Sequence, residues 1–197
     1  MEQLLRLFIA IDLPEAVKQQ MSDLQLQLRR NTGAVRWADP NGTHLTLKFL
    51  GSVRAGMVPT IVGEMERLAA KHRPFQLQTD ELGTFPSLIR PRVVWLGVRG
   101  DLPALKALQA DVERYIEPLG FPTEDRAFSP HLTLGRSVKD PSALDLVSIS
   151  GAVQQAKVLQ PIVLPVNEIV LMRSELRPRG ARYHTLAHVR LGLDAQA

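Results

Sequence analysis

His44-Leu45-Thr46-Leu47 and His131-Leu132-Thr133-Leu134 are two copies of one tetrapeptide in a chain of 197 residues. Polar and apolar residues alternate in both copies, which is the pattern of a β-strand with one buried face. Each strand would turn its leucines to the core and its histidine and threonine to the other face. A given histidine is followed by Leu-Thr-Leu roughly once in a thousand by chance. Two copies among five histidines therefore need a reason.

The elements expected around the two motifs repeat as well. Residues 6–13 contain a continuous apolar run typical of a buried strand, and residues 15–30 place apolar side chains at helical spacing. Residues 93–98 and 102–119 give the same strand and helix before the second motif. Further strands are expected over residues 35–37, 43–50, 75–85, 131–137, 162–165, 169–173 and 183–191, and further helices over residues 58–72 and 140–147.

This order of elements predicts an α+β fold of two pseudo-symmetric lobes, each an antiparallel sheet with helices on its outer face. The two His-x-Thr-x strands would line a central cleft between the lobes. Residues 1–197 are expected to form a single domain made of these two intertwined lobes. At the ends of elements, Asp12 is expected to cap the helix over residues 15–30, and Gly51 to end the first motif strand.

The composition narrows the class of protein. The apolar fraction is 45% and the charged fraction 22%, both ordinary for a soluble globular protein. The chain has no cysteine, which excludes disulfides, thiolate nucleophiles and cysteine-ligated metal centres. A net charge of +4 suits RNA or a phosphate ester as partner without requiring one. No stretch approaches a membrane span and no signal peptide is visible, so a cytoplasmic monomer without a membrane partner is expected.

Two facing histidines with hydroxyls beside them suit the opening of a cyclic phosphodiester. One imidazole takes a proton from the nucleophile, and the other gives a proton to the leaving oxygen on the far side of phosphorus. Thr46 and Thr133 would donate hydrogen bonds to the phosphoryl oxygens. With these groups supplied, the chemistry needs no metal or other cofactor. A single such motif would more often be a half-exposed polar face, and it is the repetition that favours a function.

Two side chains outside the tetrapeptides are candidates for substrate binding. Arg136 lies five residues after His131, so a flat strand would turn it to the opposite face. It reaches the phosphate only if the strand bends or twists after Gly135. Phe49 is a candidate for stacking on a nucleobase, with core packing as an equal alternative. Trp37 is assigned to the core.

Longer stretches of the chain resemble the 2H phosphoesterases, a superfamily named for two His-x-Thr-x motifs. The resemblance is greatest to its RNA 2′,3′-cyclic phosphodiesterase branch, historically called bacterial 2′-5′ RNA ligases. The similar stretches are residues 6–14, 35–37, 44–51, 82–86, 91–95 and 126–136. The resemblance covers most of the chain and is poor over residues 141–161.

The resemblance implies hydrolysis of a 2′,3′-cyclic phosphate end of RNA, or of a nucleotide, to a 2′-phosphate without metal or cofactor. It gives His44 the role of proton donor to the 3′ oxygen and His131 that of proton acceptor from water, whereas the residues alone would permit the reverse. It also implies that Thr46, Thr133 and Arg136 bind the phosphate. Attack by a 5′-hydroxyl in place of water would give weak 2′-5′ ligation. Two alternatives stay open: a non-catalytic RNA- or nucleotide-binding module, and the same chemistry on another cyclic phosphate or a 2′-5′ oligonucleotide.

Overall fold

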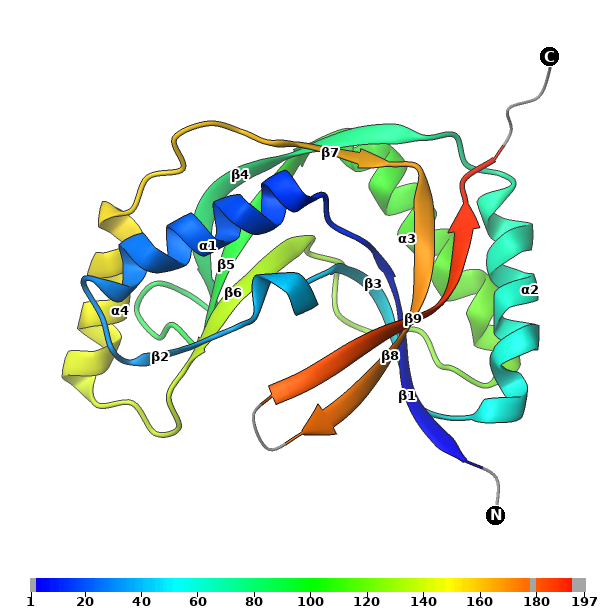
Figure 1. The fold of residues 1–197 in the computed structure, drawn as a ribbon, viewed down its shortest axis with the longest axis horizontal. Coiled ribbons are helices and arrows are strands. Elements are labelled where there is room, and N and C mark those ends of the chain that lie inside the picture. Colours follow the sequence, from blue (N-terminus) through cyan, green and yellow to red (C-terminus); the bar gives the residue numbers. More distant parts are fainter. Residues whose placement is uncertain (1–2, 178–179, 193–197) are drawn as a thin grey trace.

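The computed structural model describes residues 3–177 and 180–192 and contains two sheets and four α-helices (Figure 1). In chain order, the elements are β1 (Leu4–Ile11), α1 (Glu15–Arg29), β2 (Val35–Trp37), β3 (Leu45–Arg54), α2 (Val58–Ala69), β4 (Phe75–Phe85), β5 (Val93–Gly100), α3 (Leu102–Ile116), β6 (His131–Ser137), α4 (Ala143–Gln155), β7 (Val163–Val166), β8 (Glu168–Arg177) and β9 (Gly180–Arg190). Short 3₁₀ turns, η1 (Pro40–Gly42), η2 (Ala55–Met57) and η3 (Glu117–Leu119), join some of them. Within the described residues, no helix is long and apolar enough to cross a membrane.

The strands form two antiparallel sheets, which confirms the predicted α+β class. The first sheet has the order β3-β1-β8-β9, and the second has the order β2-β6-β5-β4-β7. Each motif strand pairs with the strand at the start of its own half of the repeat. β3 pairs with β1, which lies before α1 and the short β2, and β6 pairs with β5, which lies before α3. The repeat seen in the sequence is therefore a repeat of strand pairing.

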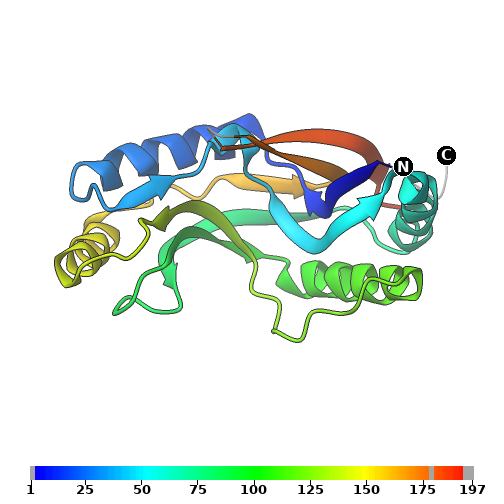
Figure 2. The ribbon, with the colours of Figure 1, turned by 90° about the horizontal axis from the view of Figure 1, so that it is seen from below.

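The helices that connect these paired strands cross to the other sheet. α1 leaves β1 of the first sheet, yet its Gln25 side chain bonds the Leu134 carbonyl of β6 in the second sheet. α3 leaves β5 of the second sheet, yet its Glu113 pairs with Lys48 of β3 in the first sheet. Figures 1 and 2 show α1 beside α4 at one end of the molecule, and α2 beside α3 at the other. Each sheet is thus covered by a helix that starts from the other one.

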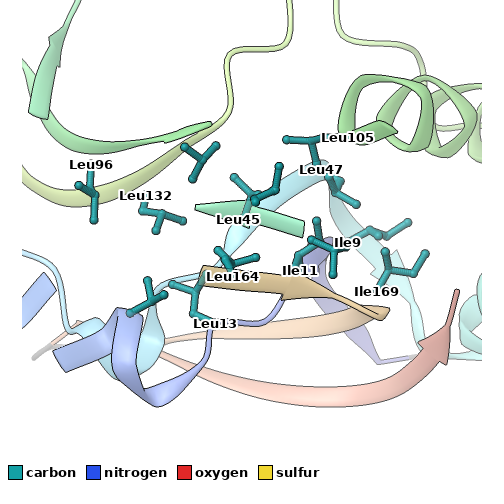
Figure 3. Close-up of a cluster of buried hydrophobic side chains, with 14 of the residues drawn as sticks. Ile9, Ile11, Leu13, Leu45, Leu47, Leu96, Leu105, Leu132, Leu164 and Ile169 are labelled. Atoms are coloured by element: carbon teal, nitrogen blue, oxygen red, sulfur yellow. The ribbon is translucent and has the colours of Figure 1, made fainter. Parts of the chain in front are cut away.

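The leucines of both motifs lie in the hydrophobic core, as the alternating pattern predicted. Leu45 and Leu132 are fully buried, and Figure 3 shows them among core side chains that come from both sheets. Leu47 and Leu134 belong to the same buried cluster. Burying one leucine side chain contributes about 1.5–3 kcal/mol to folding, so these four side chains anchor the two motif strands firmly.

Both motif strands contain a β-bulge at the same point of the motif. In the pairing of β3 with β1, Leu47 is an extra residue between Thr46 and Lys48. In the pairing of β6 with β5, Leu134 is an extra residue between Thr133 and Gly135. An extra residue shifts the alternation of the strand by one position. Side chains beyond each bulge therefore swap faces relative to a flat strand.

Some predicted boundaries are wrong for local reasons. β3 does not end at Gly51 but continues to Arg54, because Gly51 adopts a φ of 70° and is accommodated next to a second bulge in the pairing with β1. The predicted helix over residues 140–147 is instead α4, which is longer. Ser142 starts it with a capping box, in which the Ser142 and Asp145 side chains each accept a backbone N–H at the helix start.

Asp12 does not cap α1 as predicted. The N-cap position is Pro14, and no side chain bonds the helix start there. The Asp12 carboxylate instead accepts the backbone N–H of Leu13 at 2.8 Å and lies 3.7 Å from the ammonium of Lys18. It also lies close to His44, which gives it a place in the site described below.

Candidate active site

One cavity of about 1150 Å³ receives side chains from both motif strands. His44, Thr46 and Phe49 line it from β3 and the residue before it, and Thr133 and Arg136 line it from β6. Five of the six residues predicted for the site are thus lining residues of one cavity. The sixth, His131, lies on the same strand as Thr133 and is described separately below.

Two aromatic rings and a backbone hydrogen bond hold the imidazole of His44. Its ring makes edge contacts with Phe8 and Tyr183, at centroid distances of 5.8 and 5.6 Å. The imidazole also hydrogen-bonds the backbone of Gly42, two residues earlier. Burial lowers the pKa of His44, and the negative charge of Asp12 opposes this lowering. The Asp12 carboxylate oxygen lies 3.8 Å from His44 Nε2.

His131 is held in the same manner on the second motif strand. Its Nδ1 lies 2.7 Å from the carbonyl oxygen of Ser129, again two residues earlier, and can donate to it. The ring meets Phe85 edge-on at a centroid distance of 4.9 Å. Burial lowers the pKa of His131, the bond to Ser129 raises it, and the positive charge of Arg136 lowers it further. In both motifs the imidazole therefore bonds the backbone of the residue two positions earlier.

The face of β6 that carries His131 also carries Thr133, because no bulge separates them. His131 pairs with Gly97 of β5, and Thr133 pairs with Trp95. Thr133 reaches the cavity, whereas His131 is not among its lining residues. The cavity therefore extends along this face of β6 as far as Thr133, and His131 is the next side chain on that face.

Arg136 reaches the cavity because of the bulge at Leu134. The extra residue gives Arg136 the face of Thr133, which meets the condition stated for it from the sequence. Gly135 allows β2 to pack tightly at this point. A Cβ there would lie 2.5 Å from Val35 Cγ1 and 2.9 Å from the Arg36 carbonyl oxygen. A larger residue at 135 would push β2 and β6 apart.

Phe49 occupies the corresponding position beyond the bulge of β3. Its side chain is 72% exposed and lines the cavity, so it is not a core residue. The ring touches Phe8 at a centroid distance of 5.9 Å, which leaves the rest of the ring open to solvent. The two bulges thus present an aromatic ring on one strand and a guanidinium on the other.

Sequence reasoning missed Tyr183 and assigned Trp37 to the core. Tyr183 of β9 covers His44, although β9 and β3 are opposite edges of the first sheet; the sheet must curl strongly to bring them together. Trp37 packs partly on the core but also lines the cavity, with the guanidinium of Arg29 5.6 Å from its ring centre. No short-range sequence pattern predicts contacts between distant strands.

Within the part of the chain that the structure describes, no three His, Asp or Glu side chains gather as a metal site.

Comparison with known proteins identifies the family. A sequence profile described as the 2′-5′ RNA ligase superfamily matches residues 13–178. A Methanothermobacter thermautotrophicus protein named RNA 2′,3′-cyclic phosphodiesterase is 34% identical over 187 residues, which cover 94% of this chain and 98% of the relative.

Two crystal structures are similar over almost the whole fold. A Thermus thermophilus protein has a TM-score of 0.74 and 31% identity, covering 94% of this chain and 97% of its own. Escherichia coli LigT complexed with 3′-AMP has a TM-score of 0.72 and 26% identity, covering 97% of this chain and 100% of its own. The profile, the relative and both folds agree with the resemblance seen in the two His-Leu-Thr-Leu motifs. This chain belongs to the 2′-5′ RNA ligase superfamily of 2H phosphoesterases.

Proposed function

We propose that this protein hydrolyses RNA or nucleotides ending in a 2′,3′-cyclic phosphate to the 2′-phosphate, by acid–base catalysis between His44 and His131. The observation that carries the proposal is the repeated site: two identical motifs on matching bulged strands supply histidine and threonine, and the cavity between them holds Arg136. The names of the relatives agree with this activity.

In the proposed reaction, a water oxygen attacks phosphorus while His131 takes one proton from that water. The bond between phosphorus and O3′ breaks, and His44 gives its proton to O3′. The products are a free 3′-hydroxyl and a 2′-phosphate, and the two histidines exchange protonation states. Thr46, Thr133 and Arg136 stabilise the negative charge on the non-bridging oxygens. No step of this scheme requires a metal ion.

The electrostatic surroundings of the two histidines favour this assignment over the reverse. The Asp12 carboxylate near His44 favours the protonated imidazole that an acid needs. The Arg136 guanidinium favours the neutral imidazole that a base needs at His131. Burial lowers the pKa of both rings, and the negative charge of a bound phosphate favours the protonated form of His44. Asp12 and Arg136 therefore shift the pKa values of the two histidines in opposite directions.

The decisive assay supplies 2′,3′-cyclic mononucleotides and RNA oligomers with a cyclic phosphate end, in excess EDTA, and maps the product. We expect turnover to a 2′-phosphate. His44→Ala and His131→Ala should each lower kcat by about 10²–10⁴-fold, whereas His188→Ala, which removes an exposed imidazole of β9, should not. A 3′-phosphate product would overturn the assigned roles. Binding without turnover would identify a nucleotide-binding module instead.

The same site could accept a 5′-hydroxyl in place of water, which would form a 2′-5′ linkage. Water is far more concentrated, so ligation is proposed only as a minor activity. The open ring of Phe49 supports stacking of a base next to the reacting phosphate. A panel of other cyclic phosphates and 2′-5′ oligonucleotides, assayed under the same conditions, would define the range of substrates.

A further inference from the structure

Gln25 is a polar residue on the core face of α1. Its buried neighbours on the same helix face are apolar: Val17, Met21, Leu24 and Leu28. Gln25 is only 4% exposed. Burying a carboxamide among apolar groups is unfavourable unless the carboxamide is hydrogen-bonded, so the residue must gain something from its partners there.

The partners of Gln25 are two backbone carbonyls that meet beneath the second motif. Its Nε2 donates to the Ala38 carbonyl at 2.7 Å and to the Leu134 carbonyl at 3.0 Å. The Leu134 carbonyl also accepts the backbone N–H of Ala38 at 2.9 Å. Both acceptors are carbonyl oxygens, so the side chain must use both of its N–H groups, which fixes its orientation. The carboxamide thus joins α1 to the segment before η1 and to β6.

Leu134 is the extra residue of the β6 bulge, and this bulge turns Arg136 into the cavity. Without it, strict alternation would place Arg136 on the face opposite Thr133. A bulge disrupts the hydrogen bonds of the strand locally, so the buried backbone groups that it displaces need other partners. Gln25 supplies one of the two donors that the Leu134 carbonyl receives, and the other comes from Ala38.

The first motif has a matching brace from the other crossing helix. Glu113 of α3 bonds Lys48, the residue after the bulge of β3. Gln25 and Glu113 are 88 positions apart (113 − 25), against 87 for the two histidines (131 − 44). With the 87-residue offset of the histidines, Gln25 corresponds to Val112, so Gln25 and Glu113 lie one position away from equivalence. Both crossing helices nevertheless carry a polar side chain that bonds the bulge region of a strand in the opposite sheet.

We propose that Gln25 is a positioning residue that keeps Arg136 in the cavity by holding the β6 bulge. This inference rests on the proposed function, because it assumes that Arg136 binds the phosphate of the substrate. Gln25 also lines the cavity, but the two backbone carbonyls take both of its N–H groups, so it acts through the backbone of β6 rather than by donating to the substrate. Its loss should therefore weaken phosphate binding more than it slows the bound substrate.

The test replaces Gln25 by methionine, which has nearly the same length and fits a buried helix face but cannot donate a hydrogen bond. Gln19→Met is the matched control, because Gln19 is exposed on the same helix and its side chain bonds Asp23, one turn further along. Binding of inorganic phosphate is measured by calorimetry for the wild type, Gln25→Met, Arg136→Ala and the double variant. KM and kcat for a 2′,3′-cyclic nucleotide are measured alongside, with urea unfolding to record stability.

We expect Gln25→Met to lose most of the phosphate affinity that Arg136→Ala loses, with KM rising by a larger factor than kcat falls. The double variant should bind phosphate no more weakly than Arg136→Ala, because the two residues act as one unit. Unchanged phosphate affinity in Gln25→Met, with only lower stability, would overturn the proposal. Additive losses in the double variant, or a wild type that binds no phosphate, would overturn it too.

A second variant covers the case in which Gln25→Met does not fold. Gln25→Glu keeps the length and polarity but offers oxygens to the two carbonyls, so it should also lose phosphate affinity. If the wild type binds phosphate but turns over no cyclic phosphate, the proposed function fails while the phosphate titrations still decide the role of Gln25.

Discussion

Lys48 offers the sharpest test of how the first motif is held. Its side chain is buried, and its ammonium bonds the Glu113 carboxylate of α3 and the Pro122 carbonyl at 2.8 Å. Pro122 belongs to the segment that leads from η3 to His131. One side chain at the bulge of β3 therefore holds both a helix and the approach to the second motif.

Replacing Lys48 by methionine removes one charge of a buried pair and leaves the Glu113 carboxylate without its cationic partner, while the Gln109 amide still donates to it. Breaking such a pair typically costs about 3–5 kcal/mol, a large share of the roughly 5–15 kcal/mol that stabilises a typical protein. At about 2–4 °C for each kcal/mol in a chain of this size, the Tm should fall by about 6–20 °C. Removing both charges, in Lys48→Met with Glu113→Leu, should restore much of this loss, because no lone charge stays buried.

The assay is urea unfolding followed by circular dichroism, with the midpoint and the slope m compared between variants. Lys106→Met serves as the matched control, since Lys106 is an exposed residue of α3. We expect a lower midpoint with unchanged m for Lys48→Met and no change for Lys106→Met. A loss below about 1 kcal/mol, or a double variant less stable than Lys48→Met, would refute the view that a buried charge pair holds this bulge.

Three further changes test the site itself. Asp12→Asn removes the negative charge that raises the pKa of His44, so the high-pH limb of the kcat profile should move to lower pH; an unmoved limb would show that Asp12 does not support the acid. Phe49→Ala should raise KM for a cyclic nucleotide by about 5- to 160-fold, from the roughly 1–3 kcal/mol that stacking one base contributes, and an unchanged KM would exclude stacking. Gly135→Ala should lower the free energy of unfolding by about 1–3 kcal/mol in urea and weaken phosphate binding, because its Cβ meets Val35; wild-type stability would contradict this.

The sequence was sufficient for features that depend on local alternation. A period of two in His44-Leu45-Thr46-Leu47 places the leucines on one face and the polar residues on the other whatever strands lie alongside. The bounds of β4 and β6 were predicted correctly for the same reason: each follows from a short apolar pattern and its neighbouring turn.

Features that depend on the partner of a strand could not be predicted in this way. A bulge is defined only against the register of a neighbour, so the face of Arg136 stayed conditional until β5 and β6 were paired. The place of Asp12 beside His44 depends on the pairing of β1 with β3, and that of Tyr183 on the curl of the whole first sheet. Gln25 gave no signal, because a single glutamine does not alter the pattern of an amphipathic helix.

The crossing of α1 and α3 has a consequence for any half of this chain. A fragment with only β1, α1, β2 and β3 would lack the second sheet, to which β2 belongs and which α1 covers. Two identical fragments could satisfy each other by reciprocal exchange, as in a domain-swapped dimer, and would enclose one shared cavity between two identical motifs. Joining both halves in one polypeptide removes that symmetry requirement, and it allows Phe49 on one strand to occupy the position that Arg136 occupies on the other.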